Sequence, residues 1–338
     1  MKAIAAKAAS LASQDNFSGA LLVAQHGKVL LRQGYGLADR ERRVPVTPET
    51  KFRLGSMDKM FTAVAILQFV EAGKLSLDDA VGKVLPGYPN PEIASKVTVR
   101  HLLTHSGGAG DIFPEYVARK SELKSHDDFV KMLGRRAPGF EPGTAQRYSN
   151  YGFILLGVII ERLSGRSYYD HVTATVFGPA GMRSTDSPVG APVERDRAIG
   201  YVEAGATWVA NTDTLPWRGT AAGGGYSTIN DLLRFAIALQ NGTLISKNMF
   251  TAATTPVQPG SNHGLGFMIA GSEASVTVGH SGGAPGMSGE LSIFPASGSI
   301  FVSLANHGER GIASILSREF RQAVTARDKG LMEAPGAR

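Results

Sequence analysis

The chain of 338 residues contains no cysteine, which excludes disulfide bonds, metal sites built on thiolates and a cysteine nucleophile. Long apolar runs are also missing, since no stretch approaches the roughly 18 residues that a membrane-spanning helix requires. We therefore expect no membrane span. The absence of cysteine does not by itself identify the cellular compartment.

Runs of a single charge are short, although 35 basic residues outnumber 29 acidic ones and give a net charge of +6. The densest basic stretches are residues 40–43 and 135–136, and the first of them includes Glu41. Such short runs indicate a solvated surface. We therefore expect no nucleic-acid partner.

The N-terminal stretch MKAIAAKAASLASQDN is a poor signal peptide, because Lys7 interrupts its apolar part. It is better interpreted as an amphipathic helix, and the chain as written is expected to be cytoplasmic. A mature chain whose leader had been removed would look the same, so a periplasmic or secreted location stays open.

Both ends of the chain carry the patterns of antiparallel strands joined by tight turns. Two hairpins are expected, one in residues 19–36 and one in residues 289–305. Shorter strands are expected before the second hairpin, in residues 265–270 and 276–278. The helices expected to cover this sheet are residues 57–72, 232–240 and 312–326.

The middle of the chain, residues 75–217, shows mainly helical spacing broken by proline and glycine, and residues 150–163 form its most apolar helix. We therefore predict an α/β fold of the α+β type, in which an antiparallel sheet is flanked by helices. Residues 1–74 and 218–330 form the sheet domain, the middle is an inserted helical domain, and residues 331–338 are a tail. The alternative is that the middle only decorates one domain.

One motif suggests a catalytic serine, but the rest of the sequence does not support that role. The stretch GHSGG at residues 279–283 satisfies G-x-S-x-G, with Ser281 in the position of an α/β-hydrolase nucleophile. That fold needs an acid and then a histidine after the serine, and His307 is the only later histidine. The helix expected after such a serine is also missing, because APG at residues 284–286 leads into a strand. We therefore reject Ser281 as the nucleophile.

Ser56 is a stronger candidate, because it stands three residues before Lys59 at the start of an apolar helix. Lys59 then lies about one turn away on the same face, where its amine can take the hydroxyl proton. The backbone N–H of Ser56, at a helix N-terminus, can face an oxyanion. The alternative role is a helix N-cap. A second S-x-x-K, Ser121 to Lys124, lies in a charged stretch and is interpreted as surface.

Tyr148-Ser149-Asn150 directly precedes the apolar helix of the middle region. The tyrosine can relay a proton, and the asparagine amide can hold both a lysine and a substrate carbonyl. In an extended segment the first and third side chains point to the same side. The alternative is a helix cap with a packed aromatic ring.

Together these stretches resemble the penicillin-recognising serine hydrolases, in particular the class C β-lactamase branch with its family VIII carboxylesterases and related D-amino-acid peptidases. Ser56-x-x-Lys59 matches S-x-x-K, Tyr148-x-Asn150 matches Y-x-N, and HSG at residues 280–282 occupies the place of K-T-G. The segments LLTHSGG and AGGGYST also resemble the family. The resemblance covers nearly the whole chain and implies a bacterial source.

The resemblance implies a role for each matched residue. Ser56 is the nucleophile, and Lys59 and Tyr148 supply the general base, without a decision between the two. The backbone N–H groups of Ser56 and Gly283 form the oxyanion hole. The implied substrate-binding residues are Asn150, His280, Ser281 and Gly282. No cofactor is implied.

His280 departs from the family pattern, whose third motif usually begins with a lysine that binds a substrate carboxylate. A histidine is largely neutral at pH 7. This favours neutral substrates, so we predict a carboxylesterase for short to medium acyl chains, with weak β-lactam hydrolysis. The alternatives are a class C-like β-lactamase or D-amino-acid peptidase, and a non-catalytic penicillin-binding-like receptor. The expected partner is a small ester or β-lactam-like substrate, and the oligomeric state stays open.

His101 and His105 stand four residues apart, a spacing that binds zinc on some helices. HLLTH lacks the glutamate of H-E-x-x-H, however, and the family resemblance makes the segment structural. We therefore expect no metal.

Overall fold

The computed structural model describes residues 1–113, 115–190, 196–205, 207–211, 216–272, 275–307 and 312–328. Its strands are β1 (Gly19–Gln25), β2 (Lys28–Tyr35), β3 (Leu37–Asp39), β4 (Val44–Pro45), β5 (Phe52–Arg53), β6 (Tyr201–Ala204), β7 (Thr207–Ala210), β8 (Tyr226–Ser227), β9 (Met268–Ala270), β10 (Thr277–Ala284), β11 (Met287–Phe294) and β12 (Ser299–Ala305). Its α-helices are α1 (Lys2–Ser13), α2 (Lys59–Glu71), α3 (Val81–Val84), α4 (Pro91–Lys96), α5 (Val99–Leu103), α6 (Glu115–Arg119), α7 (His126–Leu133), α8 (Asn150–Ser164), α9 (Tyr168–Val172), α10 (Gly178–Ala180), α11 (Ile229–Gln240), α12 (Lys247–Ala253) and α13 (Ile312–Asp328). The short helices η1 (Gly55–Asp58) and η2 (Lys120–Glu122) are 3₁₀, and η3 (Thr173–Phe177) is a π-helix.

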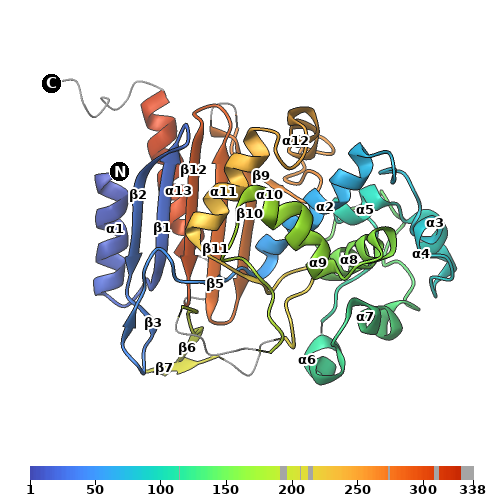
Figure 1. The fold of residues 1–338 in the computed structure, drawn as a ribbon, viewed down its shortest axis with the longest axis horizontal. Coiled ribbons are helices and arrows are strands. Elements are labelled where there is room, and N and C mark those ends of the chain that lie inside the picture. The colour runs from blue at the N-terminus through green and yellow to red at the C-terminus, as the bar shows by residue number, and fades with distance from the viewer. Residues whose placement is uncertain are drawn as a thin grey trace.

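The main sheet is antiparallel and joins both ends of the chain, in the strand order β2-β1-β12-β11-β10-β9 (Figure 1). Strand β1 pairs with β12 along its whole length, so the first and last hairpins lie side by side. Both expected hairpins are confirmed. The two expected short strands correspond to β9 and to the first part of β10, which continues to Ala284 because it pairs with β11 along its length.

Helices cover both faces of the sheet, because its central strands are apolar on both sides. Successive side chains of a strand point to opposite faces. Leu21 and Val23 of β1 therefore pack in one cluster with residues of α1 and α13, whereas Ala20 and Leu22 join the cluster that contains α2 and α11. The predicted antiparallel sheet with flanking helices is confirmed.

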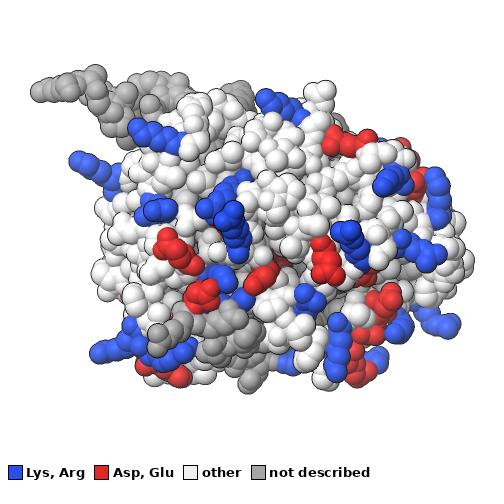
Figure 2. All heavy atoms as spheres, viewed as in Figure 1, with Lys and Arg blue, Asp and Glu red and all other residues white. Residues whose placement is uncertain are grey.

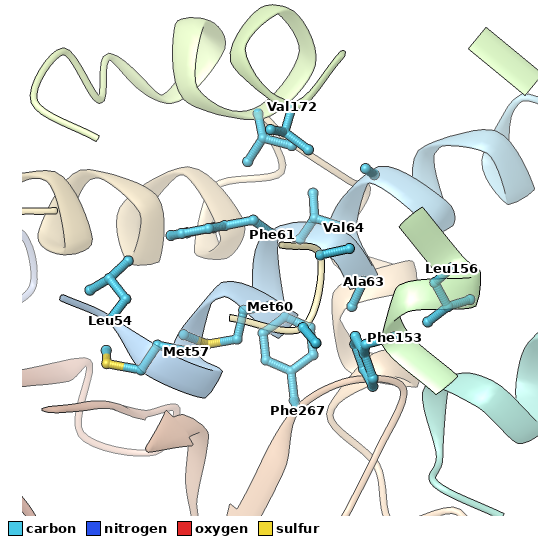
Figure 3. Packing of buried hydrophobic residues seen from close by; sticks show 14 of the residues in the cluster. Leu54, Met57, Met60, Phe61, Ala63, Val64, Phe153, Leu156, Val172 and Phe267 are labelled. Atoms are coloured by element: carbon cyan, nitrogen blue, oxygen red, sulfur yellow. The ribbon is translucent and has the colours of Figure 1, made fainter. Parts of the chain in front are cut away.

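Helix α2 is buried along most of its length, with apolar side chains packed on all sides (Figure 3). Phe153 and Leu156 of α8 lie on one side of it, and Phe267 approaches from the loop before β9. The expected helix 57–72 is divided, because its first residues form η1. Tight packing leaves α2 little freedom to shift, so its first residue, Lys59, is held firmly in place.

The middle of the chain contributes helices α3 to α9 beside the sheet, and α8 is the longest of them (Figure 1). Part of it is not helical: β6 and β7 form a hairpin within residues 201–210. This hairpin contacts the end of the main sheet, where the Tyr201 N–H donates to the Asn306 carbonyl at 2.8 Å. The boundaries at 74/75 and 217/218 stay a prediction, and the tail at 331–338 lies outside the described residues.

The surface carries mixed charge on the face drawn in Figure 2, where Lys and Arg side chains are interspersed with Asp and Glu. In the described parts of the chain, every helix is too short or too polar to span a bilayer.

Candidate active site

Ser56 and Lys59 meet where η1 runs directly into α2. The Nζ atom of Lys59 lies 3.1 Å from the Oγ atom of Ser56. The Lys59 side chain is fully buried, whereas Ser56 is half-buried and can be reached from solvent. The S-x-x-K spacing therefore brings an amine within hydrogen-bond distance of an accessible hydroxyl.

A left-handed glycine sets the turn before the serine. Gly55 has a φ of +52°, and a Cβ atom there would lie 2.8 Å from the Sδ atom of Met287, so a larger residue would be strained and crowded. The Gly224 N–H donates to the Gly55 carbonyl at 3.3 Å, and the Leu54 N–H donates to the Gly225 carbonyl at 2.8 Å. The glycine-rich segment before β8 thus holds the serine turn in place.

Three oxygen atoms surround the amine of Lys59. Besides the Ser56 hydroxyl, they are the Oδ1 atom of Asn150 at 2.8 Å and the carbonyl oxygen of Ala222 at 2.5 Å. A neutral lysine amine has two N–H donors and one lone pair. Asn150 and Ala222 can accept the two N–H bonds, because neither oxygen has a proton to give. The lone pair is then directed at the hydroxyl of Ser56.

Burial lowers the pKa of Lys59 to about 7, since a charge is costly to hold away from water. The carboxylates of Asp111 and Asp58 oppose this shift. Burial also raises the pKa of Asp58, whose Oδ2 atom accepts the Gly225 N–H at 2.6 Å. A substantial fraction of Lys59 is therefore neutral near pH 7 and able to accept a proton.

Tyr148 lies close to both Lys59 and Ser56. The Lys59 Nζ is 4.8 Å from the centre of its ring, and its side chain hydrogen-bonds to Ser56. Burial of its hydroxyl end raises the pKa of Tyr148, although the residue as a whole is 38% exposed. A tyrosinate is therefore disfavoured at neutral pH. This contrast with Lys59 favours the lysine as the proton acceptor and the tyrosine as a donor.

The two histidines of HLLTH support different segments. The Nδ1 atom of His105 accepts the backbone N–H of Ser149 at 3.1 Å, and its ring lies 4.4 Å from that of Tyr148. The Nδ1 atom of His101 instead accepts the Thr98 N–H at 3.3 Å. His105 therefore positions the tyrosine segment. Across the residues that the structure describes, no cluster of three His, Asp or Glu side chains could hold a metal ion.

His280 lies on β10 and is buried. Its Nδ1 atom is 2.6 Å from the Ser281 carbonyl oxygen, which can only accept, so Nδ1 carries the proton. Burial lowers the pKa of His280 to about 3, and the nearby Lys59 adds to this effect. The ring is therefore neutral, with an unprotonated Nε2 atom.

The strand that carries the G-x-S-x-G match packs directly against the serine turn. Ser281 is a strand residue whose Oγ contacts the Sδ atom of Met268 at 3.6 Å. A Cβ atom on Gly282 would lie 2.0 Å from the Leu54 carbonyl oxygen. The backbone nitrogen of the exposed Gly283 lies next to Gly55. This arrangement brings Gly283 close to the serine, whereas its role in an oxyanion hole stays a prediction.

Two contributors to the site were missed by sequence reasoning. The carbonyl of Ala222 is a backbone group, so no side-chain pattern marks it, although it lies in the family-like segment AGGGYST. Asp111 follows the segment LLTHSGG, and its carboxylate accepts the Nδ2 amide of Asn150 at 3.0 and 3.3 Å. Its position three residues after that segment is the only available signal.

Comparison with known proteins identifies the family to which this chain is similar. The sequence matches the family described as "Beta-lactamase" over residues 4–319. "Penicillin-binding protein 4*" of Bacillus subtilis (strain 168) is 34% identical over 304 residues, which are 82% of this chain and 66% of that protein. "Esterase EstB" of Burkholderia gladioli is 35% identical over 177 residues, 48% of this chain and 45% of the esterase.

A solved structure supports the same family assignment. The penicillin-binding protein from Bacillus halodurans superposes with a TM-score of 0.82 at 30% identity, and the match covers 96% of this chain and 98% of that one. The chain spans slightly less than two thirds of the length of its curated Bacillus subtilis relative and less than half of the esterase. The family resemblance expected from the motifs is confirmed, and the chain belongs to the β-lactamase family.

Proposed function

We propose that this chain hydrolyses neutral carboxylic esters through an acyl-enzyme on Ser56. The observation that carries the proposal is the pair of Ser56 and Lys59, 3.1 Å apart, with the pKa of the lysine lowered to about 7 by burial. A buried amine that is partly neutral at physiological pH is suited to activate a hydroxyl.

In the first step Lys59 accepts the hydroxyl proton while the Oγ of Ser56 forms a bond to the ester carbonyl carbon. The backbone N–H groups of Ser56 and Gly283 donate to the resulting oxyanion. The acyl–oxygen bond then breaks, and Tyr148 passes the proton from Lys59 to the departing alcohol. Water attacks the acyl-enzyme by the same route, gives the carboxylic acid and restores the serine.

The neutral state of His280 supports an uncharged substrate. Lysine at this position would offer a cation to a substrate carboxylate, whereas the imidazole offers an unprotonated Nε2 atom. The similarity to a protein named an esterase agrees with this choice. Ser281 and Gly282 lie on the same strand, and Asn150 lies beside Lys59, so all three are proposed to contact the substrate.

A second candidate function is acylation by β-lactams, which the names of two penicillin-binding relatives favour. The test compares steady-state turnover of p-nitrophenyl butyrate and of a chromogenic cephalosporin, each with the wild type and with Ser56→Ala. The proposal expects fast ester turnover that Ser56→Ala abolishes, with slow cephalosporin opening. Cephalosporin turnover as fast as that of the ester would replace the esterase assignment with the β-lactamase one.

The nucleophile itself is tested by labelling with a fluorophosphonate probe followed by peptide mapping. We expect the label on Ser56, with Ser281→Ala labelled as efficiently as the wild type. Labelling of Ser281 with Ser56 left free would overturn the mechanism.

A further inference from the structure

Asp111 lies in the loop between α5 and α6 and is anchored there by contacts of its own. Its carbonyl oxygen accepts from the Nη1 of Arg136 at 2.7 Å, and its Oδ1 accepts the Ile112 N–H at 2.7 Å. Both carboxylate oxygens also face the Nδ2 of Asn150, at 3.0 and 3.3 Å. The residue is half-buried. The carboxylate is therefore fixed independently of the amide that it contacts.

This contact selects one of the two orientations open to the amide of Asn150. A carboxylate can only accept hydrogen bonds, so it attracts the NH₂ end and repels the oxygen end. With Nδ2 on Asp111, the Oδ1 atom points to the Nζ of Lys59 at 2.8 Å. A rotated amide would place two oxygens against each other on the side of Asp111 and would present N–H groups to Lys59.

The orientation of this amide decides what the Lys59 lone pair can do. In the observed arrangement the two N–H bonds of the neutral amine are taken by the oxygens of Asn150 and Ala222, and the lone pair faces Ser56. If the amide turned, its N–H would donate to that lone pair. The amine would then be occupied and unable to accept the proton of the serine.

We propose that Asp111 is a positioning residue of this hydrolase: it locks the amide of Asn150 so that the free lone pair of Lys59 is directed at Ser56. The proposal rests on the function proposed above and extends it to a residue outside the S-x-x-K, Y-x-N and HSG motifs. Asp111 acts through Asn150 and Lys59 without contacting the substrate.

Asp111 also acts through its charge. It raises the pKa of Lys59 against the effect of burial, and its removal lets that pKa fall further. The other titratable groups around the Lys59 amine are one more carboxyl and three side chains that stay neutral near pH 7. The carboxyl is Asp58 on the serine turn, and the neutral groups are His105, His280 and Tyr148.

The experiment measures kcat/KM for p-nitrophenyl butyrate between pH 5 and 9 in the wild type, Asp111→Asn and Asp111→Ala. Asp111→Ala loses both the orientation of the Asn150 amide and the negative charge near Lys59. The alkaline plateau of kcat/KM should therefore fall about 10- to 100-fold, and the acidic limb should move to lower pH. Asp111→Asn keeps an oxygen that accepts from Asn150. Its acidic limb should move in the same direction, with a clearly smaller loss of the plateau.

A double-mutant cycle separates positioning from a general structural effect. In the background of Asn150→Ala, the plateau loss caused by Asp111→Ala should disappear, because no amide is left to orient. The matched control is Asp78→Asn, which removes an exposed carboxylate paired with Arg100 at 2.9 Å and should leave the pH profile unchanged. Full additivity in the cycle, or an acidic limb that does not move in either Asp111 variant, would overturn the proposal.

The rate of Ser56 labelling by a fluorophosphonate is followed in the same variants, together with the melting temperature. Wild-type labelling without ester turnover would contradict the ester substrate alone, and the pH profile of labelling would then decide the role of Asp111. Absence of wild-type labelling at Ser56 would overturn both proposals. If Asp111→Ala does not fold, the shift in Asp111→Asn and its cycle with Asn150→Ala decide.

Discussion

The Nε2 atom of His126 accepts the backbone N–H of Ala221 at 3.0 Å. Because an N–H only donates, the proton of this imidazole lies on Nδ1, which donates to Glu161 at 3.1 Å. The next residue, Ala222, provides the carbonyl that accepts from Lys59. A buried histidine at the start of α7 thus holds the backbone segment that positions the catalytic amine.

Replacement of His126 by phenylalanine should therefore reduce activity, although this residue acts through the Ala221 backbone and is not proposed to contact the substrate. The Ala221 N–H would lose its buried acceptor, a cost that the segment can relieve by moving, and kcat/KM should fall about tenfold. Glu161→Gln serves as the control, because its amide oxygen can still accept from Nδ1 and activity should stay within about twofold. Wild-type kcat/KM in a folded His126→Phe variant would show that the contact is not needed.

The rate of acylation should depend on the protonation of Lys59. Its pKa in the folded chain is lowered to about 7, so the neutral, active form is populated above that pH and is lost as the pH falls. We expect kcat/KM for an ester to rise through a midpoint near pH 7. Lys59→Arg cannot become neutral and should lose at least about a thousandfold in rate. A wild-type rate that is constant from pH 5.5 to 8.5 would count against Lys59 as the base.

His280→Lys should shift the preference toward substrates that carry a carboxylate. An added cation can pair with the carboxylate of a cephalosporin, whereas the neutral ester gains nothing from it. We expect the ratio of kcat/KM for cephalosporin to that for p-nitrophenyl butyrate to rise about tenfold or more. His280→Gln, which is neutral, is the matched control and should leave the ratio low. An equal rise in both variants would exclude charge as the cause.

Asp58 should make the stability of the fold depend on pH. Burial raises its pKa to about 7, so folding favours the protonated carboxyl. Its contribution to stability is complete below about pH 4, its unfolded pKa, and is lost as the pH rises through 7. Asp58→Asn keeps an acceptor for the Gly225 N–H and removes this ionisation. Its melting temperature should exceed that of the wild type by about 2 °C or more at pH 8, with a smaller difference at pH 5.

Calorimetry at both pH values checks this expectation. A difference in melting temperature that is the same at pH 5 and pH 8 would mean that ionisation of Asp58 does not control stability.

Local sequence patterns were sufficient to predict the main elements of the fold. The hairpins of β1–β2 and β11–β12 depend on alternation and on turn residues that are neighbours in the chain, and both were predicted. Helix α8 begins at Asn150, where its apolar run was expected to start. The hairpin of β6 and β7 was not predicted, because strands of four residues each give too little pattern to distinguish them from their surroundings.

The sequence by itself determined the candidate nucleophile and its partner, because Ser56 and Lys59 lie one helical turn apart and their distance follows from local geometry. The family motifs added Tyr148, Asn150 and His280 as expectations.

Only the tertiary structure decided which groups surround the Lys59 amine. Asn150 is 91 positions away from Lys59 and Ala222 is 163 positions away, so neither contact follows from spacing. Asp111 and His126 act one layer further out, through Asn150 and Ala221. The burial that lowers the pKa of the lysine is likewise a property of the packed core around α2. Sequence patterns report chemistry between chain neighbours, whereas desolvation and long-range hydrogen bonds exist only once the chain has folded.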